Sequence, residues 1–377
     1  MKSFVYILFL SVFIYAELFS QSITPEGQIN SWLSVNPSSD FTAQAGLRFI
    51  PSFTIEKQTN KIKYDSEISV NTYGILDFDS KGVEPDGNFK PYRIWIRMST
   101  EQFELRAGLQ KINFGPATML RPLMWFDRID PRDPLQLTDG VYGILGRYYF
   151  LNNANIWIWG LYGNENTKGW EFIQGNKKRP EYGGRLQIPA LKGEMAISYH
   201  NREVDYSKSV FDTTITGLAN SNENRLGLDG RWDIGIGLWF ESTLLHQDIP
   251  KEYLPWQKQI NIGLDYTFGI GKGLNVIKEF LYVSATQSAF KFKNNISFSA
   301  LALRYPVGLL DNITAMVYYD WTNNDWYRFV NWQRQYDKIS LYLMVFWNPD
   351  EFGIYQNLED NSLFTGTGLQ FMFVYNY

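Results

Sequence analysis

The chain has 377 residues, a formal net charge of −4 and no cysteine, which excludes a disulfide or thiolate–metal framework and gives no reason to expect a nucleic-acid partner. Aromatic residues make up 17% of the sequence, with 13 Trp, 24 Tyr and 27 Phe. The mean hydropathy of −0.27 is nevertheless too low for a helical membrane protein, so these numbers favour a chain that alternates lipid-facing and water-facing residues.

Residues 1–20 predict a cleaved signal peptide. A basic start, Met1-Lys2, precedes the apolar run FVYILFLSVFIYA, and polar sequence begins at Gln21 after small residues near Ser20. The run is shorter than the ~20 residues that a spanning helix needs, and an N-terminal membrane anchor is the alternative. No cysteine follows the run, which excludes a lipid-anchored lipoprotein. We expect one domain over residues 21–377, because no Pro/Ser-rich linker divides them.

Alternation with a period of two runs through this domain. In the segment 259–268, Ile260, Ile262 and Leu264 share one face, while Asn261 and Asp265 share the other, as successive side chains of a strand do. Similar segments fall near 28–37, 43–57, 61–76, 90–100, 102–112, 140–151, 154–163, 180–189, 193–203, 223–234, 236–247, 257–268, 274–287, 296–305, 312–321, 325–335, 338–348 and 365–377.

These segments predict an all-β fold, a single transmembrane antiparallel β-barrel of about 18 strands, each near the ~9–11 residues needed to cross a membrane. A barrel of about 16 strands stays open, and a secreted β-sandwich, solenoid or propeller would also alternate. The charged face of nearly every strand, the lack of a repeat period and the aromatic last residue, Tyr377, favour the barrel. Long polar connections are expected at 77–89, 113–139, 164–179, 204–222, 248–256 and 349–364.

The longest connection, 111–140, is predicted to fold into the barrel. It is broken by prolines and contains an apolar stretch, Met119–Phe126, that needs a surface to pack on. The alternative is a loop at the rim whose charges pair with one another in water. If the loop narrows a pore, its charged residues are candidates for the constriction: Arg121, Asp127, Arg128, Asp130, Arg132 and Asp133, together with Asp139.

Charged residues within the strands are predicted to line the lumen, because a charge on the lipid face costs ~2–4 kcal/mol at mid-membrane. By position in their strands they are Arg48, Arg93, Arg97, Arg106, Arg147, Arg185, Arg225, Arg231 and Arg328, with Asp65, Glu67, Glu104, Asp229, Glu241, Asp265 and Asp320. Fixed charges in a pore select solutes by sign. Guanidinium groups suit anionic solutes, or sugars alongside Trp95, Trp159 and Trp239. The alternative is that these charges brace the wall as cross-strand salt bridges.

The segment RAGLQKINFG, Arg106–Gly115, followed by DRIDPRDP at 127–134, resembles porin-like barrels of the alginate-export and related outer-membrane families. The resemblance covers 102–150 specifically and the remainder only by its barrel pattern. It implies an outer-membrane channel for passive diffusion of small hydrophilic, anionic or sugar solutes. The last strand alternates apolar residues and closes on Tyr377, which resembles the assembly signal of outer-membrane β-barrels and implies recognition by the barrel-assembly machinery. The alternative function is a filled structural barrel that binds another envelope protein.

We expect no enzyme and no cofactor. The chain has two histidines, His200 and His246, and Ser198 lies two residues from His200 on the same strand face without a third group in view. Two distant histidines also do not make a metal site. An energy-coupled transporter is not expected, because strand pattern begins directly after the signal peptide and leaves no room for a plug domain.

Overall fold

A computed structural model describes residues 22–37, 42–208, 220–293, 295–349 and 364–377. The predicted signal peptide lies outside them. In chain order the strands are β1 (Ser22–Asn36), β2 (Thr42–Gln58), β3 (Lys63–Asp79), β4 (Gly82–Ser99), β5 (Phe103–Gln110), β6 (Val141–Tyr149), β7 (Asn155–Leu161), β8 (Glu181–Ala190), β9 (Gly193–Asp205), β10 (Asn220–Asp233), β11 (Gly237–Gln247), β12 (Trp256–Phe268), β13 (Leu274–Thr286), β14 (Asn295–Pro306), β15 (Asp311–Asp320), β16 (Asp325–Gln335), β17 (Ile339–Trp347) and β18 (Thr367–Asn376). Two short 3-10 helices lie between strands, at Tyr206–Lys208 and Lys251–Tyr253.

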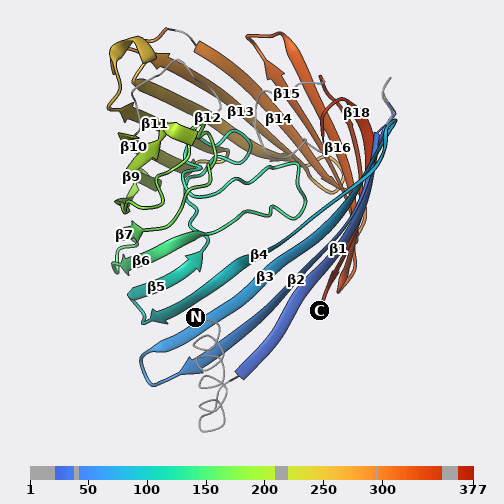
Figure 1. Cartoon of the computed structure of the whole chain (residues 1–377), viewed down its shortest axis with the longest axis horizontal. Helices are drawn as coiled ribbons and strands as arrows, with labels where there is room; N and C mark the ends of the chain where they lie inside the picture. Colours follow the sequence, from blue (N-terminus) through green and yellow to red (C-terminus); the bar gives the residue numbers. More distant parts are fainter. Residues whose placement is uncertain (1–21, 38–41, 209–219, 294, 350–363) are drawn as a thin grey trace.

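The 18 strands form one closed antiparallel sheet, which confirms the predicted barrel (Figure 1). Each strand pairs with its neighbours in sequence, and β1 pairs with β18 in an eight-residue register from Gln28–Asn376 to Val35–Leu369. Closure pairs the two strands that would otherwise be edges, and a spanning sheet requires this because lipid offers no hydrogen-bond partners. No helix among the described residues is long and apolar enough to cross a membrane.

The closing seam uses the last residue of the chain. The backbone of Tyr377 exchanges two hydrogen bonds with Gly27, at 3.2 and 3.1 Å. Its ring stacks on Phe49, with centroids 6.4 Å apart. A Cβ on residue 27 would lie 2.3 Å from the Tyr377 hydroxyl, so this position has room only for glycine unless the ring moves. The final aromatic residue is therefore part of the wall.

The outer surface is apolar along the middle of the strands. Ile96, Ile158 and Ile262 are 61–67% exposed on β4, β7 and β12, and each alternates with residues that point inward. Solvent-exposed isoleucines repeated around a closed sheet are what a lipid-facing band requires.

The connections differ in length between the two rims. At the rim that holds the start of β1 and the end of β18, strands are joined by short turns such as Leu191-Lys192 and 234–236. The opposite rim holds the long connections, among them 111–140 and 162–180. The expected contrast between short turns and long loops is thus present among the described segments.

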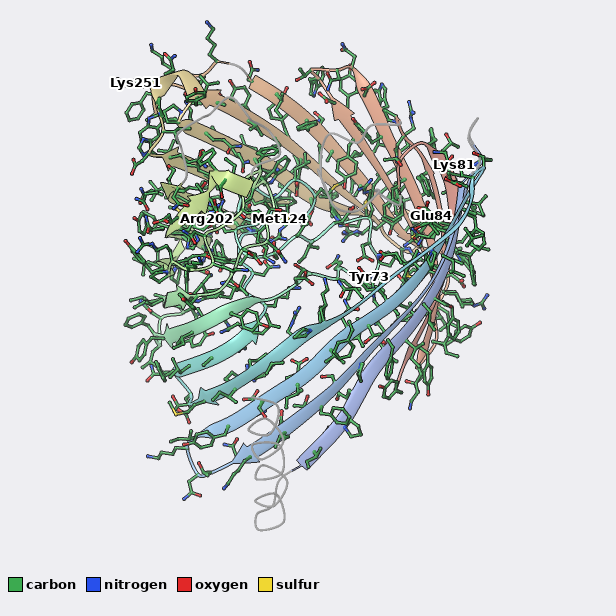
Figure 2. The ribbon with its side chains drawn as sticks, in the orientation of Figure 1. Tyr73, Lys81, Glu84, Met124, Arg202 and Lys251 are labelled. Atoms are coloured by element: carbon green, nitrogen blue, oxygen red, sulfur yellow. The ribbon has the colours of Figure 1, made fainter. Side chains whose placement is uncertain are left out.

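The prediction of a long connection at 77–89 is wrong. β3 continues to Asp79 and β4 starts at Gly82, so only Ser80 and Lys81 form the turn. The Asp79 carboxylate accepts hydrogen bonds from the backbone N–H of Lys81 and Gly82, at 2.7 and 3.0 Å, which closes the hairpin. Lys81 and Glu84 mark its tip in Figure 2.

Pro85 and Gly87 hid this half of β4 from the sequence analysis, because both residues disfavour strands. They are tolerated here because β4 pairs with β5 only over Ile94–Ser99, which leaves the upper half of β4 as an edge. β1 also begins earlier than predicted, at Ser22, because 22–27 pair with 51–56 of β2.

Arginine at position 262 should destabilise the barrel by about 2–4 kcal/mol, because this side chain faces lipid at mid-strand, whereas arginine at 268 should cost about 0–1 kcal/mol near the rim. Both residues lie on the outward face of β12. Urea unfolding of Ile262→Arg and Phe268→Arg in phospholipid bilayers measures the difference. Equal losses would contradict the proposed position of the membrane.

Candidate functional site: two loops inside the barrel

The connection 111–140 between β5 and β6 lies inside the barrel. It crosses from its own strands toward β11–β13 (Figure 1), and its apolar residues are almost completely buried, with Leu120 at 0% and Met124 at 2% exposure. Met124 lies among the side chains of the interior in Figure 2. The sequence prediction that this loop folds inward agrees with this placement.

Two buried carboxylates on the opposite wall hold the loop. Glu279 of β13 accepts hydrogen bonds from the backbone N–H of Thr118, Met119 and Leu120 at 2.6–3.2 Å, and from the Thr118 hydroxyl at 3.0 Å. Glu241 of β11 accepts from the N–H of Ala117 and Leu123, at 2.7 and 3.1 Å. These charge-assisted bonds satisfy backbone donors that the loop would otherwise bury unpaired. We call the two residues the carboxylate clasp.

Glycines let the loop approach the clasp closely. Gly115 has a φ of +94°, and a Cβ there would lie 2.3 Å from Glu241 Oε1. On β10, a Cβ at Gly227 would lie 2.6 Å from Leu123 Cδ2 and 3.1 Å from the Trp125 ring. The loop therefore sits against the wall at two positions where a side chain would displace it.

The predicted constriction residues pair mainly with one another and with the second loop. Arg121 and Asp127 are both buried and 3.3 Å apart, and Arg132 forms a 2.6 Å ion pair with Asp130. Burial raises the pKa of Asp127, against the opposing effect of the Arg121 guanidinium. Burial also raises the pKa of Asp133, which accepts the N–H of Leu135 and Leu137.

The connection 162–180 also enters the barrel and packs on the first loop. Trp170 Nε1 donates to the Arg121 carbonyl at 2.9 Å, Gly169 N donates to the Asp127 carbonyl at 3.0 Å, and Arg128 donates to Thr167. Glu171 then fastens this loop to the wall through Arg202 and Arg225, at 2.8 and 2.6 Å. The two loops therefore form one body inside the barrel.

The inner face of β13–β18 is apolar, which the sequence analysis did not anticipate. Tyr318, Phe329 and Phe346 are fully buried there, and they form one cluster with Met119 and Leu120 of the first loop. Apolar side chains thus face both lipid and loop on these strands. The loop body is pressed against this wall by hydrophobic contact as well as by the clasp.

The inner face of β3–β5, continued by Arg147 of β6, is charged and partly exposed, whereas Val141 and Leu145 of β6 are buried under the first loop. Glu104 lies 3.6, 3.2 and 3.5 Å from Arg97, Arg106 and Arg147, and Arg97 also pairs with Asp65 at 2.6 Å. The side chains of Arg97, Arg106, Arg147 and Glu104 keep 12–25% of their surface exposed. We call this set the Glu104 cluster. It faces the lumen on the side that the loop body leaves uncovered.

Apart from Arg328, the other predicted lumen residues also point inward, and most are paired. Arg185 forms a bidentate pair with Asp229, at 2.6 and 2.7 Å. Arg231 lies 3.4 Å from Asp265, and Arg93 donates to the Thr138 carbonyl at 2.9 Å. The geometry agrees with the bracing alternative for these side chains, and their part in selecting solutes stays a prediction.

One of the inward assignments is wrong. Arg328 shares the outward face of β16 with Trp326, which it approaches at 5.9 Å, while its neighbours Tyr327 and Phe329 are buried inside. The sequence suggested the opposite because both faces of β16 carry aromatic residues. Trp159 and Trp239, named as sugar contacts, are each 2% exposed and packed within the interior.

The arrangement around His200 does not activate a serine. Its Nδ1 accepts from Trp159 Nε1 at 3.2 Å and its Nε2 lies 3.3 Å from Glu181. Ser198 Oγ accepts from Arg185 at 3.1 Å. With both ring nitrogens engaged, the histidine has no free atom to serve as a base for Ser198. Within the described ranges no three His, Cys, Asp or Glu side chains converge as metal ligands.

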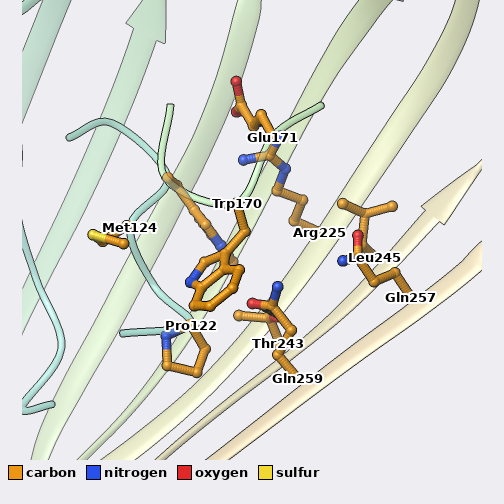
Figure 3. Close-up of a pocket in the computed structure, with 10 residues that line it drawn as sticks. Pro122, Met124, Trp170, Glu171, Arg225, Thr243, Leu245, Gln257 and Gln259 are labelled. Carbon is orange, nitrogen blue, oxygen red and sulfur yellow. Dashed lines mark hydrogen bonds and ion pairs between the residues drawn. The ribbon is translucent and has the colours of Figure 1, made fainter. Parts of the chain in front are cut away.

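A pocket lies where the loop body meets β10–β12 (Figure 3). Trp170 stands at its centre, opposite polar side chains of the wall. The pocket is lined by Pro122, Met124, Trp125, Trp170, Glu171, Arg225, Thr243, Leu245, Gln257 and Gln259.

Sequence reasoning missed Glu279 and Trp170, the residues that hold the first loop and form the centre of the pocket. Glu279 had a usable signal, because it is a lone acid between the inward-facing apolar residues Ile277 and Leu281 of one strand. Trp170 had none, since its position in a connection is set by packing against the other loop.

Comparison with solved structures finds the same architecture. The chain is similar to OccAB4 of Acinetobacter baumannii, with a TM-score of 0.59 at 7% identity over 95% of this chain and 99% of that one. It is similar to OccK7 (OpdD) of Pseudomonas aeruginosa, with a TM-score of 0.56 at 10% identity over 95% and 99%. It is also similar to an anion-selective porin of Comamonas acidovorans, with a TM-score of 0.50 at 11% identity over 95% and 100%.

These TM-scores show the fold, which is that of outer-membrane porins. No protein-family model matches the chain, and no curated protein matches it. The likeness of 102–150 to alginate-export barrels is therefore not extended by these comparisons.

Replacing one clasp carboxylate should loosen the first loop. Glu279→Gln places an amide NH₂ among backbone N–H donors, and hydrogen bonds to a charged group are worth about 1.5–3 kcal/mol each. We expect the barrel to persist while trypsin gains access to the Arg128–Ile129 bond. Limited proteolysis in bilayers followed by mass spectrometry measures this, with Lys278→Gln, on the outward face of the same strand, as the matched control. Protection equal to that of the unchanged protein would contradict the clasp.

Proposed function

We propose that the chain forms an outer-membrane channel through which small hydrophilic solutes, anions or sugars, diffuse passively. The observation that carries the proposal is the uneven filling of the barrel. The loop body packs on β6, β7 and β10–β18, whereas the inward side chains of the Glu104 cluster keep part of their surface exposed. A partly exposed, polar track past the Glu104 cluster is what a passive pore needs.

The charges around the Glu104 cluster balance. Arg97, Arg106 and Arg147 face Asp65, Glu67 and Glu104, three cations against three carboxylates. A compensated lining gives a weak preference for the sign of the solute. This supports sugars over simple anions.

A second candidate is a filled barrel that binds another envelope protein. The apolar inner wall of β13–β18 favours it, because this wall is packed by loop residues as a protein core is. The two candidates differ in whether ions cross the barrel.

We further propose that the barrel-assembly machinery recognises the last strand, β18. Leu369, Phe371 and Phe373 alternate outward on it, and the chain ends on an aromatic residue. The paired seam with β1 supports this proposal, because assembly must end with that pairing.

Single-channel recording of the mature protein in a planar bilayer should show discrete openings with a weak preference for either ion. Glu104→Gln leaves three arginines around a neutral amide and should shift the reversal potential in a salt gradient toward anions. Arg147→Gln should shift it toward cations. Lys61→Gln in the exposed β2–β3 turn is the control.

Three outcomes decide between the candidates. Opposite shifts support the pore along the Glu104 cluster. Openings without any shift place the conducting path elsewhere in the barrel. A folded, heat-modifiable barrel without conductance overturns the channel and favours the filled barrel.

A further inference from the structure

We propose that five neighbouring turns at the periplasmic rim of the barrel form a docking surface for a periplasmic protein with an acidic, apolar face. The turns join β6 to β7, β8 to β9, β10 to β11, β12 to β13 and β14 to β15. They belong to the rim with short turns, which is the periplasmic rim of outer-membrane barrels. The proposal concerns the tips of these turns and does not depend on whether the barrel conducts.

Each of the five turns exposes aliphatic side chains. Leu151 and Leu191 are 92% and 83% exposed, and Leu309 is fully exposed. Ile234, Ile236, Ile270, Val307 and Leu310 are the other exposed aliphatic residues of these turns. We call the eight residues the rim arc. Neighbouring hairpin tips are two strands apart, about 10 Å, so the arc is one patch, and a gathered apolar patch marks a surface that another molecule covers.

The other short turns of this rim are polar. They are the β2–β3, β4–β5 and β16–β17 turns, where Lys61, Glu101 and Asp337 are exposed. None of these described turns exposes an aliphatic side chain. The aliphatic tips are therefore a feature of one side of the rim and not of its turns in general. The Glu104 cluster lies on β4–β6, so a protein on the rim arc leaves most of that side of the mouth uncovered.

The position of the rim arc excludes two other occupants. On β12, Tyr266 and Phe268 form an edge-to-face pair with ring centroids 4.8 Å apart, and on β6 Tyr148 and Phe150 form another at 4.9 Å. Such outward aromatic residues mark the membrane surface, and the turns lie beyond them, outside the lipid. A second copy in the same membrane cannot cover the arc, because both copies present these turns in the same direction.

The turns of the rim arc are held to one another. Trp232 Nε1 at the end of β10 donates to the carbonyl of Ala190, next to the β8–β9 turn, at 3.1 Å. Lys272 Nζ in the β12–β13 turn donates to the carbonyl of Val307 in the β14–β15 turn. The arc is therefore a preformed surface, and a partner loses little affinity to ordering it.

The charges within the arc indicate the chemistry of the partner. Lys192 and Lys272 are exposed in the β8–β9 and β12–β13 turns, and neither forms an ion pair in the described part of the chain. Asp233, at the start of the β10–β11 turn, lies 3.3 Å from Arg231 and is already paired. An apolar arc with two unpaired cations complements an apolar surface that carries carboxylates.

The first experiment locates the rim arc relative to lipid, with the full mature protein in phospholipid bilayers. The chain has no cysteine, so Leu151→Cys, Leu191→Cys and Leu309→Cys each take a single nitroxide label. We expect a water-soluble nickel complex to relax these labels severalfold more strongly than dissolved oxygen does, as at the control Lys61→Cys. Ile262→Cys, in the lipid-facing band, should give the reverse. The reverse at the arc as well would overturn the proposal in favour of membrane contact.

The second experiment finds the partner in intact cells of the source organism. p-Benzoylphenylalanine replaces Leu151 or Leu309 in the arc, and Glu101 or Asp337 in the polar turns as matched controls. We expect ultraviolet light to join the arc positions, but not the controls, to one protein, which mass spectrometry identifies.

Binding of that purified protein to the barrel in nanodiscs then tests the surface itself. Lys192→Glu combined with Lys272→Glu should weaken binding about fivefold or more, and Leu309→Ser should weaken it by a similar factor. Lys61→Glu, at a polar turn, should leave the dissociation constant unchanged.

Three further results would overturn the docking surface: no protein adduct at the arc, equal adducts at the polar turns, or binding that neither the lysine reversals nor Leu309→Ser weakens. None of them bears on conductance. A barrel that conducts without a partner keeps the proposed function, and a partner that binds a silent barrel supports the docking surface alone.

Discussion

Every backbone N–H and C=O that faces lipid must find its partner within the protein, and this constraint governs the structure. The chain meets it by pairing each strand with the next and the last with the first. The demand reaches the final residue, because Tyr377 still exchanges backbone bonds with Gly27. Once the sheet is closed into a barrel, the side chains on its inner face can take a different role from the lipid-facing side chains.

The inside solves the same problem for irregular backbone. A connection of thirty residues without helix or strand cannot enter a closed interior unless its N–H groups are satisfied. Glu241 and Glu279 accept them directly, and Glu171 extends the arrangement through two arginines to the second loop. The lumen is thereby divided between a packed half and a wet half, and the geometry of the wet half follows from where the carboxylates stand on the wall.

The period-two pattern predicted all eighteen strands, because each strand places an apolar, lipid-facing residue at every second position. The prediction failed where this alternation is missing. The upper half of β4 contains Pro85 and Gly87 and lacks regular alternation. It is still a strand because it pairs only with β3, so the proline removes no hydrogen bond to β5. Arg328 was placed on the wrong side because β16 is aromatic on both faces.

The candidate site was accessible to sequence reasoning only in part. The long proline-rich connection, with apolar residues that need a surface, indicated an infolded loop. Charged positions within strands indicated the inward face. The contacts of the loop could not be predicted. Glu279 and Trp170 lie far from their loop partners in sequence, and no periodic pattern connects them. The pairing of each arginine with a carboxylate also depends on side chains in adjacent strands. The register between those strands is known only once the sheet is closed.

The separation in sequence between the first loop and the carboxylate clasp also sets the order of assembly steps. Thr118 bonds to a carboxylate 161 residues later in the chain, so the docking of the first loop cannot be completed until β13 has joined the sheet. Until then Met119 and Leu120 lack their cluster partners on β13–β18. Filling of the lumen is therefore a late step, and closure of the wall does not wait for it, because β1 and β18 meet through their own backbones.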